Sequence, residues 1–265
     1  MTSREATSYL PRAATAEESA EWRRSPSDWA ALLAIGAIQW PWLLRSLWGG
    51  KRRDKKKLLE RLALPAESLP KLGSWKADVG FLTRIVDHIE QHRPAHVVEL
   101  GAGASTLVTA RALQLHGGGT LTSFDQHHDF VEAVAAWLNE HQLTVNLHHA
   151  PLVPASAHWP ALWYDLSKLP DTIDLLLIDG PPWTLHPFVR GSAEQLFDRM
   201  TPGGVIMLDD AARPGERFVA ARWKTRWPDF DWRLLSGIKG TLLGIKRIAI
   251  QYVVVGYTAC TINTW

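Results

Sequence analysis

A glycine turn between a short apolar run and a helical stretch constrains this chain more than any other feature of its sequence. Residues 96–106 read His-Val-Val-Glu-Leu-Gly-Ala-Gly-Ala-Ser-Thr, so an apolar run meets two glycines one residue apart. Glycine lets the backbone turn sharply and approach a ligand that any Cβ would block. At the carboxyl end of a buried strand, such a turn is how doubly wound sheets hold a nucleotide-like ligand. A dinucleotide fingerprint would have a third glycine where this chain has Thr106. The alternative is a tight turn that binds no ligand.

Length and composition allow one large α/β domain with an appendage. The 265 residues are 46% apolar, which is enough for a substantial core. The net charge of +2 gives no global attraction to nucleic acid, so we expect no nucleic-acid partner. The single cysteine, Cys260, excludes an intramolecular disulfide and a cysteine-built zinc site. We therefore expect a cytoplasmic protein.

The first 64 residues divide into two segments. Residues 1–28 are polar and show no clear periodicity or secretory signal, and we expect them to be disordered. Residues 29–64 combine an apolar, Trp-rich helix at 29–48 with a basic run at 51–57. Three interpretations stay open for this segment. The first is a membrane-spanning helix, for which the segment is barely long enough. The second is an interfacial anchor at the inner face of the membrane. The third is a helix that packs on the domain or on a partner subunit, as in a homodimer.

From residue 70 to 247 the sequence alternates between strand and helix patterns, which indicates a parallel sheet with helices on both faces. The expected strands are 96–100, 120–124, 144–149, 173–178 and 204–208, and the expected helices are 78–92, 105–116, 129–142, 192–200 and 215–226. Two short strands, 232–236 and 241–246, close as an antiparallel hairpin. The predicted fold class is therefore α/β, a doubly wound Rossmann-like sheet with a C-terminal antiparallel strand and a helical N-terminal appendage. We expect residues 150–170 to form a loop and 248–265 a tail.

Carboxylates recur where the predicted strands end. Asp125 ends the second strand, 22 residues after Gly103, where a carboxylate is placed to accept hydrogen bonds from ribose hydroxyls. Asp179 ends the fourth strand within Ile-Asp-Gly-Pro-Pro-Trp, and Asp209 with Asp210 ends the fifth. Each of these residues has an alternative role in capping a turn or a helix.

Taken together, these motifs resemble the class I S-adenosylmethionine-dependent methyltransferases. The resemblance covers residues 75–247 and is carried by Val-Glu-Leu-Gly-Ala-Gly-Ala-Ser-Thr, Asp125, Ile-Asp-Gly-Pro-Pro and Leu-Asp-Asp-Ala-Ala-Arg. Within the family, the chain looks like the bacterial group that methylates oxygen atoms of small molecules or glycans. The resemblance implies direct displacement, in which an acceptor oxygen takes the methyl group of S-adenosylmethionine.

The resemblance also implies which residues form the site. The expected cofactor-binding residues lie at strand ends and in the following turns: Glu99, Gly101, Ala102, Gly103, Ser105, Asp125, Gln126 and Asp179. In the family, the acidic residue that ends the first strand helps to hold the amino group of the cofactor. Metal-dependent relatives of the catechol type take Mg²⁺ ligands from the fourth and fifth strand ends, which are Asp179, Asp209 and Asp210 here. As catalytic residues we expect Asp179 and His186, with His186 as a proton acceptor at the rim.

Two other classes of function stay open on the sequence. An NAD(P)-dependent oxidoreductase would use the same sheet, but Thr106 replaces the glycine that it needs. A non-catalytic, membrane-associated scaffold would keep the fold without binding the cofactor, and the presence of Glu99 and Asp125 argues against it.

Overall fold

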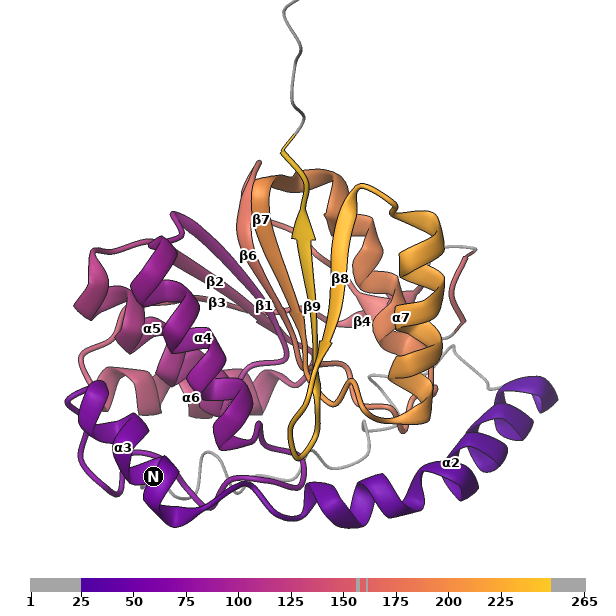
Figure 1. The fold of residues 1–265 in the computed structure, drawn as a ribbon, viewed down its shortest axis with the longest axis horizontal. Coiled ribbons are helices and arrows are strands. Elements are labelled where there is room, and N and C mark those ends of the chain that lie inside the picture. The colour runs from indigo at the N-terminus through magenta and orange to yellow at the C-terminus, as the bar shows by residue number, and fades with distance from the viewer. Residues whose placement is uncertain (1–24, 156–157, 161, 249–265) are drawn as a thin grey trace, which may run out of the picture.

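A seven-stranded sheet forms the centre of the protein in the computed structural model, which describes residues 25–155, 158–160 and 162–248 (Figure 1). The strand order is β3-β2-β1-β6-β7-β9-β8. The parallel strands are β1 (His96–Leu100), β2 (Thr120–Asp125), β3 (Asn146–His149), β6 (Ile173–Ile178) and β7 (Met200–Leu208). The antiparallel hairpin consists of β8 (Phe230–Leu235) and β9 (Thr241–Lys246). This arrangement confirms the predicted fold class. It places the reversal of strand order, where such sheets bind ligands, between β1 and β6.

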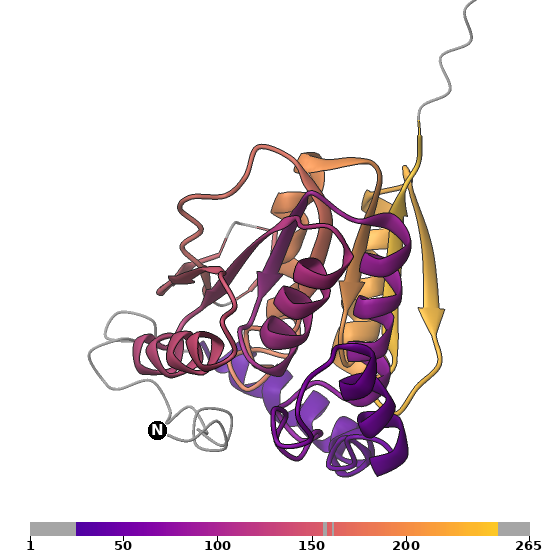
Figure 2. The same cartoon turned by 90° about the vertical axis from the view of Figure 1, so that its left-hand side faces the viewer.

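Helices cover both faces of the sheet, as Figure 2 shows from the side. The helices are α2 (Pro26–Ser46), α3 (Arg52–Arg61), α4 (Val79–His92), α5 (Ala104–His116), α6 (His128–Glu140) and α7 (Pro214–Arg226). Side chains of α3, α4, α5 and α6 form one apolar core with the sheet. On the opposite face, α7 and a 3-10 helix (Val189–Arg199) form a second core. The sheet is therefore the middle layer of three.

Alternation along the central strands explains how one sheet serves two cores. In β6, Leu175 and Leu177 belong to the core under α4 and α5, whereas Leu176 and Ile178 belong to the core under α7. Successive side chains of a strand point to opposite faces, so a strand that is covered on both sides needs an unbroken apolar run. Leu-Leu-Leu-Ile at 175–178 meets this requirement, and the one polar residue of the strand, Asp174, is only partly buried.

The structure differs from the predicted elements at three places. The expected loop at 150–170 contains a small antiparallel sheet, β4 (Leu152–Pro154) and β5 (Leu162–Tyr164), whose apolar side chains pack on the second core. The helix expected at 192–200 is the 3-10 helix that begins at Val189. Strand β7 begins at Met200 rather than at 204, because Met200 pairs with Ile173 before a shift in register. Of the predicted terminal segments 1–28 and 248–265, residues 1–24 and 249–265 lie outside the described part of the chain. Residues 25–28, expected to be disordered, cap and begin a helix instead.

The N-terminal helix α2 runs along the end of the molecule at which the parallel strands terminate (Figure 1). It begins with a capping box, in which the Ser25 hydroxyl accepts from the backbone N–H of Asp28 while the Asp28 carboxylate accepts from the N–H of Ser25. Within the described residues, we find no helix with the length and apolar character required to cross a membrane.

Asp78 links α4 to the hairpin of β8 and β9. Its carboxylate caps α4 by accepting from the backbone N–H of Phe81 at 2.7 Å. The other oxygen accepts from the backbone N–H of Lys239, in the hairpin turn, at 3.2 Å. Asp78 is only 3% exposed, so both bonds form away from water. A single buried carboxylate thus joins segments that are 161 residues apart in the sequence.

We expect Asp78→Ala to lower the free energy of unfolding by about 1–3 kcal/mol, because it removes a helix cap and leaves a second buried N–H without its acceptor. Denaturant unfolding measures this change. The matched control is Asp87→Ala on the same helix, where an exposed carboxylate pairs with Arg61, and its cost should stay below about 1 kcal/mol. Equal costs for the two variants would contradict the proposed linking role.

Candidate functional site

A cavity of about 320 Å³ lies at the carboxyl ends of β1, β2, β6 and β7. Its walls come from the loops that follow these strands, from β5, from α2 and from residues 74–77. Six of the residues predicted from the sequence line it, namely Gly101, Ala102, Asp125, Gln126, Asp179 and Asp210. Five do not: Glu99, Gly103, Ser105, His186 and Asp209.

The glycine turn brings two strand ends into direct contact. Gly101 has φ +96°, and a Cβ built on it would lie 2.6 Å from the backbone nitrogen of Gly180, after β6. A Cβ on Gly180 would in turn lie 2.2 Å from the Tyr164 hydroxyl oxygen. No larger residue fits at either position without moving the backbone. The two glycines therefore set the depth of the cavity floor.

Glu99 supports the turn from behind and does not reach the cavity. It is fully buried, and its Oε2 accepts from the hydroxyls of Thr106 at 2.5 Å and Ser123 at 2.6 Å. The Thr106 hydroxyl also accepts from the backbone N–H of Gly103 at 2.8 Å. Burial raises the pKa of Glu99 to about 7, although hydrogen bonds from Ser105, Ser123 and Thr106 oppose the shift. Its Oε1 has no hydrogen-bond partner within the described residues. Glu99 does not line the cavity, so the expected contact with the cofactor amino group stays a prediction.

Asp125 lies on the cavity wall at the end of β2, in the predicted position. Its Oδ2 accepts from the N–H of Ala102 at 3.2 Å, and its Oδ1 accepts from the N–H of His127 at 3.0 Å. Each carboxylate oxygen can accept more than one hydrogen bond, so capacity remains for hydroxyl donors in the cavity. Burial raises the pKa of Asp125 to about 7, while the backbone donors lower it.

Two buried polar atoms on the cavity wall lack a hydrogen-bond partner within the described part of the chain. They are the Tyr164 hydroxyl and the Gln126 Oε1. A buried polar group without a partner costs on the order of 1–3 kcal/mol, which a bound ligand with polar groups would recover. The cavity therefore fits a ligand that offers both donors and apolar surface.

We expect the affinity for S-adenosylhomocysteine to rise about tenfold between pH 6 and pH 8, because the ionised form of Asp125 accepts hydroxyl donors and its pKa is about 7. Asp125→Asn should remove this pH dependence. Asp125→Ala should weaken binding by about 10- to 100-fold. Calorimetric titration measures both effects. A pH dependence that persists in Asp125→Asn would assign the titration to another group, such as Glu99.

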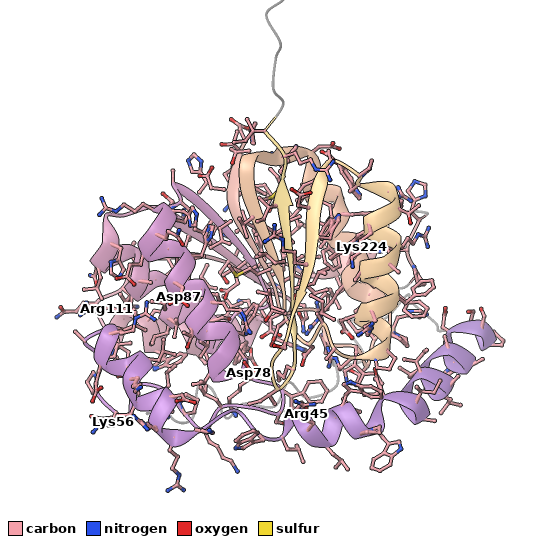
Figure 3. All side chains as sticks on the ribbon, in the orientation of Figure 1. Arg45, Lys56, Asp78, Asp87, Arg111 and Lys224 are labelled. Atoms are coloured by element: carbon pink, nitrogen blue, oxygen red, sulfur yellow. The ribbon has the colours of Figure 1, made fainter. Side chains whose placement is uncertain are left out.

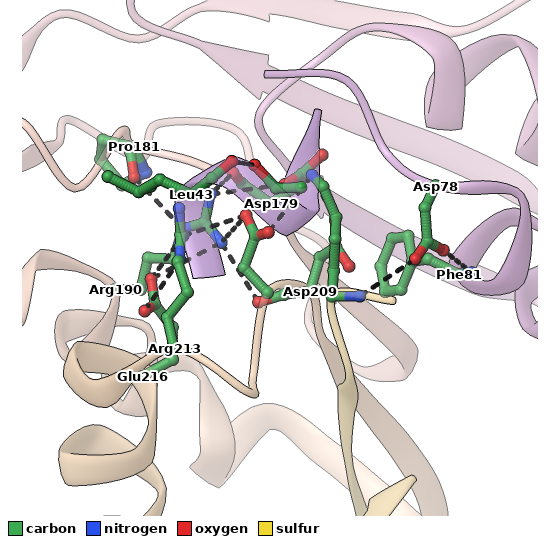
Figure 4. Close-up of polar contacts among 12 residues, drawn as sticks. Leu43, Asp78, Phe81, Asp179, Pro181, Arg190, Asp209, Arg213 and Glu216 are labelled. Atoms are coloured by element: carbon green, nitrogen blue, oxygen red, sulfur yellow. Dashed lines mark hydrogen bonds and ion pairs between the residues drawn. The ribbon is translucent and has the colours of Figure 1, made fainter. Parts of the chain in front are cut away.

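A cluster of buried charges occupies the ends of β6 and β7 (Figure 4). Arg190 lies 3.3 Å from the Asp179 carboxylate and 3.4 Å from that of Asp210. Arg213 lies 3.0 Å from Asp210 and 2.6 Å from Glu216. Burial would raise the pKa of Asp210, but Arg213, Lys239 and Arg190 together hold it below its usual value. Burial raises the pKa of Asp179 above its usual value, with Arg190 opposing the shift.

The three carboxylates predicted as metal ligands do come together, since one oxygen each from Asp179, Asp209 and Asp210 lies within 4.8 Å of the others. The chain supplies its own cation at this place. The Lys239 ammonium is 3.4 Å from Asp209 and 3.2 Å from Asp210, and its side chain is 1% exposed. Arg190 also pairs with Asp179, whereas Asp209 Oδ1 has no hydrogen-bond partner within the described residues. The chain's own cations therefore compete with a divalent ion for these carboxylates, and the predicted Mg²⁺ site stays a prediction.

We expect Mg²⁺ to leave the melting temperature of the parent protein unchanged and to raise that of Lys239→Ala. Removing the ammonium leaves buried carboxylates unpaired, so the variant should lose about 3–5 kcal/mol and regain part of it when a cation binds. Thermal unfolding with Mg²⁺ and with chelator measures this response, and Lys246→Ala serves as a lysine control outside the cluster. Stabilisation of the parent protein by Mg²⁺ would show that Lys239 does not exclude the metal.

His186 does not reach the cavity. It is 3% exposed, its Nε2 lies 3.9 Å from the Asp28 carboxylate of α2, and its Nδ1 accepts from the backbone N–H of Phe188 at 3.1 Å. These contacts fasten α2 to the loop after β6. The position gives His186 no path to a ligand in the cavity, so it does not support the predicted role of proton acceptor.

Four residues of the site were not predicted in the roles that the structure gives them: Tyr164, Arg190, Arg213 and Lys239. Tyr164 lies in a segment without a motif, and the three cations come from the 3-10 helix, the start of α7 and the β8–β9 turn. Arg213 lies three residues after Asp210 in the motif Leu-Asp-Asp-Ala-Ala-Arg, but no spacing connects the other elements to the carboxylates. The one available signal was the excess of carboxylates at adjacent strand ends, since buried acids require nearby cations.

Comparison with known proteins agrees with this geometry. A family model described as a methyltransferase domain matches residues 98–211. The SAH-bound methyltransferase PaMTH1 of Podospora anserina shares 14% identity, with a TM-score of 0.51 over 91% of this chain and 99% of that one. An O-methyltransferase from Bacillus cereus in complex with SAH shares 14% identity, with a TM-score of 0.51 over 82% and 100%. The O-methyltransferase TomG from Streptomyces achromogenes, in complex with SAM, shares 15%, with a TM-score of 0.50 over 80% and 96%.

A search of curated proteins returned no match. At identities of this size, the solved structures establish the fold alone. The methyltransferase domain model matches residues 98–211, which are less than half of the chain. Fold and matched domain together confirm the resemblance to class I S-adenosylmethionine-dependent methyltransferases that the sequence showed.

Proposed function

We propose that this class I methyltransferase binds S-adenosylmethionine in the cavity and transfers its methyl group to an oxygen of a small-molecule or glycan acceptor. The observation that supports the proposal is the cavity, which is lined by the glycine turn and Asp125. The Tyr164 hydroxyl and Gln126 Oε1 also line it, and both lack a hydrogen-bond partner within the described residues. The match of residues 98–211 to a methyltransferase domain argues against an NAD(P)-dependent oxidoreductase.

The residues at the ends of β1 and β2 would hold the cofactor. Gly101 and Ala102 expose backbone at the cavity floor, Asp125 accepts from hydroxyl groups, and Gln126 offers a side-chain amide beside it. When bound, S-adenosylmethionine supplies an electrophilic methyl group on a sulfonium, which an acceptor oxygen displaces. The protein contributes alignment and removal of one proton.

The acceptor would lie toward the ends of β6 and β7, where Asp179, Tyr164 and Trp183 line the cavity. Burial raises the pKa of Asp179, so its carboxylate is a stronger base than an exposed aspartate. This carboxylate would accept the proton of the acceptor hydroxyl when the acceptor oxygen takes the methyl group and S-adenosylhomocysteine is released. Arg190 holds the Asp179 carboxylate in place, and Trp183 supplies an apolar wall.

We expect Asp179→Asn to lower kcat by about 10²-fold or more, since it removes the proton acceptor, while the affinity for S-adenosylhomocysteine changes little. The assay follows formation of S-adenosylhomocysteine with catechol, a simple phenol and a free hexose as acceptors, over a range of pH. Asp171→Asn, an exposed aspartate before β6, is the matched control.

Two outcomes would contradict the proposal. Failure of the folded parent protein to bind S-adenosylhomocysteine would remove the cofactor assignment. If the protein methylates an amine and none of the hydroxyl acceptors, the target atom is nitrogen rather than oxygen.

A further inference from the structure

We propose that the outer face of α2, together with the basic surface of α3, is a docking surface for an anionic lipid membrane. The sequence of α2 is apolar nearly all round, whereas the structure shows which of its residues face the domain and which face outward. One side packs on the domain, and the other is exposed along the whole helix.

The inner side of α2 belongs to the methyltransferase domain. Leu43, Ser46 and Leu47 line the cavity, and a Cβ on Gly36 would meet the Trp183 ring at 3.8 Å. Gln39 is fully buried. The helix is therefore fixed on the domain, and its orientation determines which residues face outward.

The outer side of α2 is apolar at every exposed position from 29 to 44. Exposed residues recur at 29–30, 33–34, 37–38, 40–41 and 44, the spacing of one helical face. Leu33 is 68% exposed, Trp40 is 58% and Leu44 is 56%. Seven of the thirteen exposed large apolar side chains in the described part of the chain fall between 29 and 48. Contiguous apolar surface of this kind marks an interaction site.

A run of cations follows this face in the sequence and lies at the same end of the molecule. Between 45 and 57 the chain carries seven lysines and arginines and a single aspartate. Lys51, Arg52, Arg53, Lys56 and Lys57 are exposed. Figures 1 and 2 place α2 and α3 at the same end of the molecule, and Figure 3 shows Arg45 and Lys56 there.

This combination fits a lipid surface better than a second copy of the chain. Leucine and tryptophan side chains on one helical face enter the boundary between headgroups and acyl chains, where indoles are favoured. Each lysine or arginine near an anionic surface adds about 1 kcal/mol. Pairing two copies through this face would instead bring two basic runs together, and like charges oppose association. Because none of the described helices could span a membrane, α2 would lie in the plane of the surface.

The test is co-flotation of the full chain with vesicles of phosphatidylcholine alone and of phosphatidylcholine mixed with phosphatidylglycerol. We expect binding to the anionic vesicles and little to the neutral ones. The double variant Leu33→Ala, Leu44→Ala should lower the vesicle affinity at least about tenfold. Its control is Leu115→Ala, Leu234→Ala, which removes two exposed leucines elsewhere and should bind as the parent does.

A charge-reversal pair tests the basic surface. Arg53→Glu, Lys57→Glu on α3 should lower the affinity for anionic vesicles at least about tenfold. Lys224→Glu, Arg233→Glu, on α7 and β8, reverses two exposed cations away from α2 and should change it little.

Titration with S-adenosylhomocysteine accompanies every variant, because Leu33, Leu44 and the α3 cations do not line the cavity. Absence of vesicle binding with intact titration would overturn the docking surface and leave the proposed function standing. Equal binding by the test and control variants would also overturn it. A dimer that the leucine variant dissociates, without vesicle binding, would assign the face to a second copy.

Discussion

Buried carboxylates at the ends of β6 and β7 must be neutralised, and much of the site follows from how the chain does this. Isolated ionised groups in a protein interior cost many kcal/mol unless they are paired. Here Arg190, Arg213 and Lys239 supply the opposite charges from three separate elements. Lys239 depends in turn on Asp78, which holds the hairpin turn against α4. The charge cluster therefore fastens the C-terminal hairpin to the first helix of the domain, and it shapes one wall of the cavity at the same time.

Local sequence was sufficient for the strands and for the residues at their ends. The strand over 173–178 was predicted with its bounds because an unbroken apolar run is what a doubly covered strand requires. The glycine turn and Asp125 were predicted because a sharp turn and a strand-terminal carboxylate are local features. Arg190 and Lys239 come from elements distant in the sequence, so their pairing with Asp179 and Asp210 was not predicted and a metal was expected at these carboxylates. Tyr164 was missed because β5 is held by packing on the second core rather than by a pattern of its own.

Thr106 shows how one substitution in a familiar turn changes its chemistry. In a dinucleotide fingerprint the third glycine allows close packing of helix and strand. Here the threonine hydroxyl joins the N–H of Gly103 to the Glu99 carboxylate, so the turn is held by a hydrogen-bonded chain. Glu99 Oε2 consequently accepts hydrogen bonds from within the protein. The position of a carboxylate at a strand end does not show whether it binds a ligand or supports the turn. The hydroxyl groups that surround it determine which of the two it does.

Helix α2 is a wall of the cavity on one side and an outer surface on the other, with Leu43 facing inward and Leu44 outward. Adjacent residues of one rigid element thus belong to two different environments. If a contact on the outer face changes the free energy of filling the cavity, a molecule in the cavity changes the affinity of that outer contact by the same amount. A helix shared in this way would allow attachment at the outer face and occupancy of the cavity to influence each other without a separate regulatory domain.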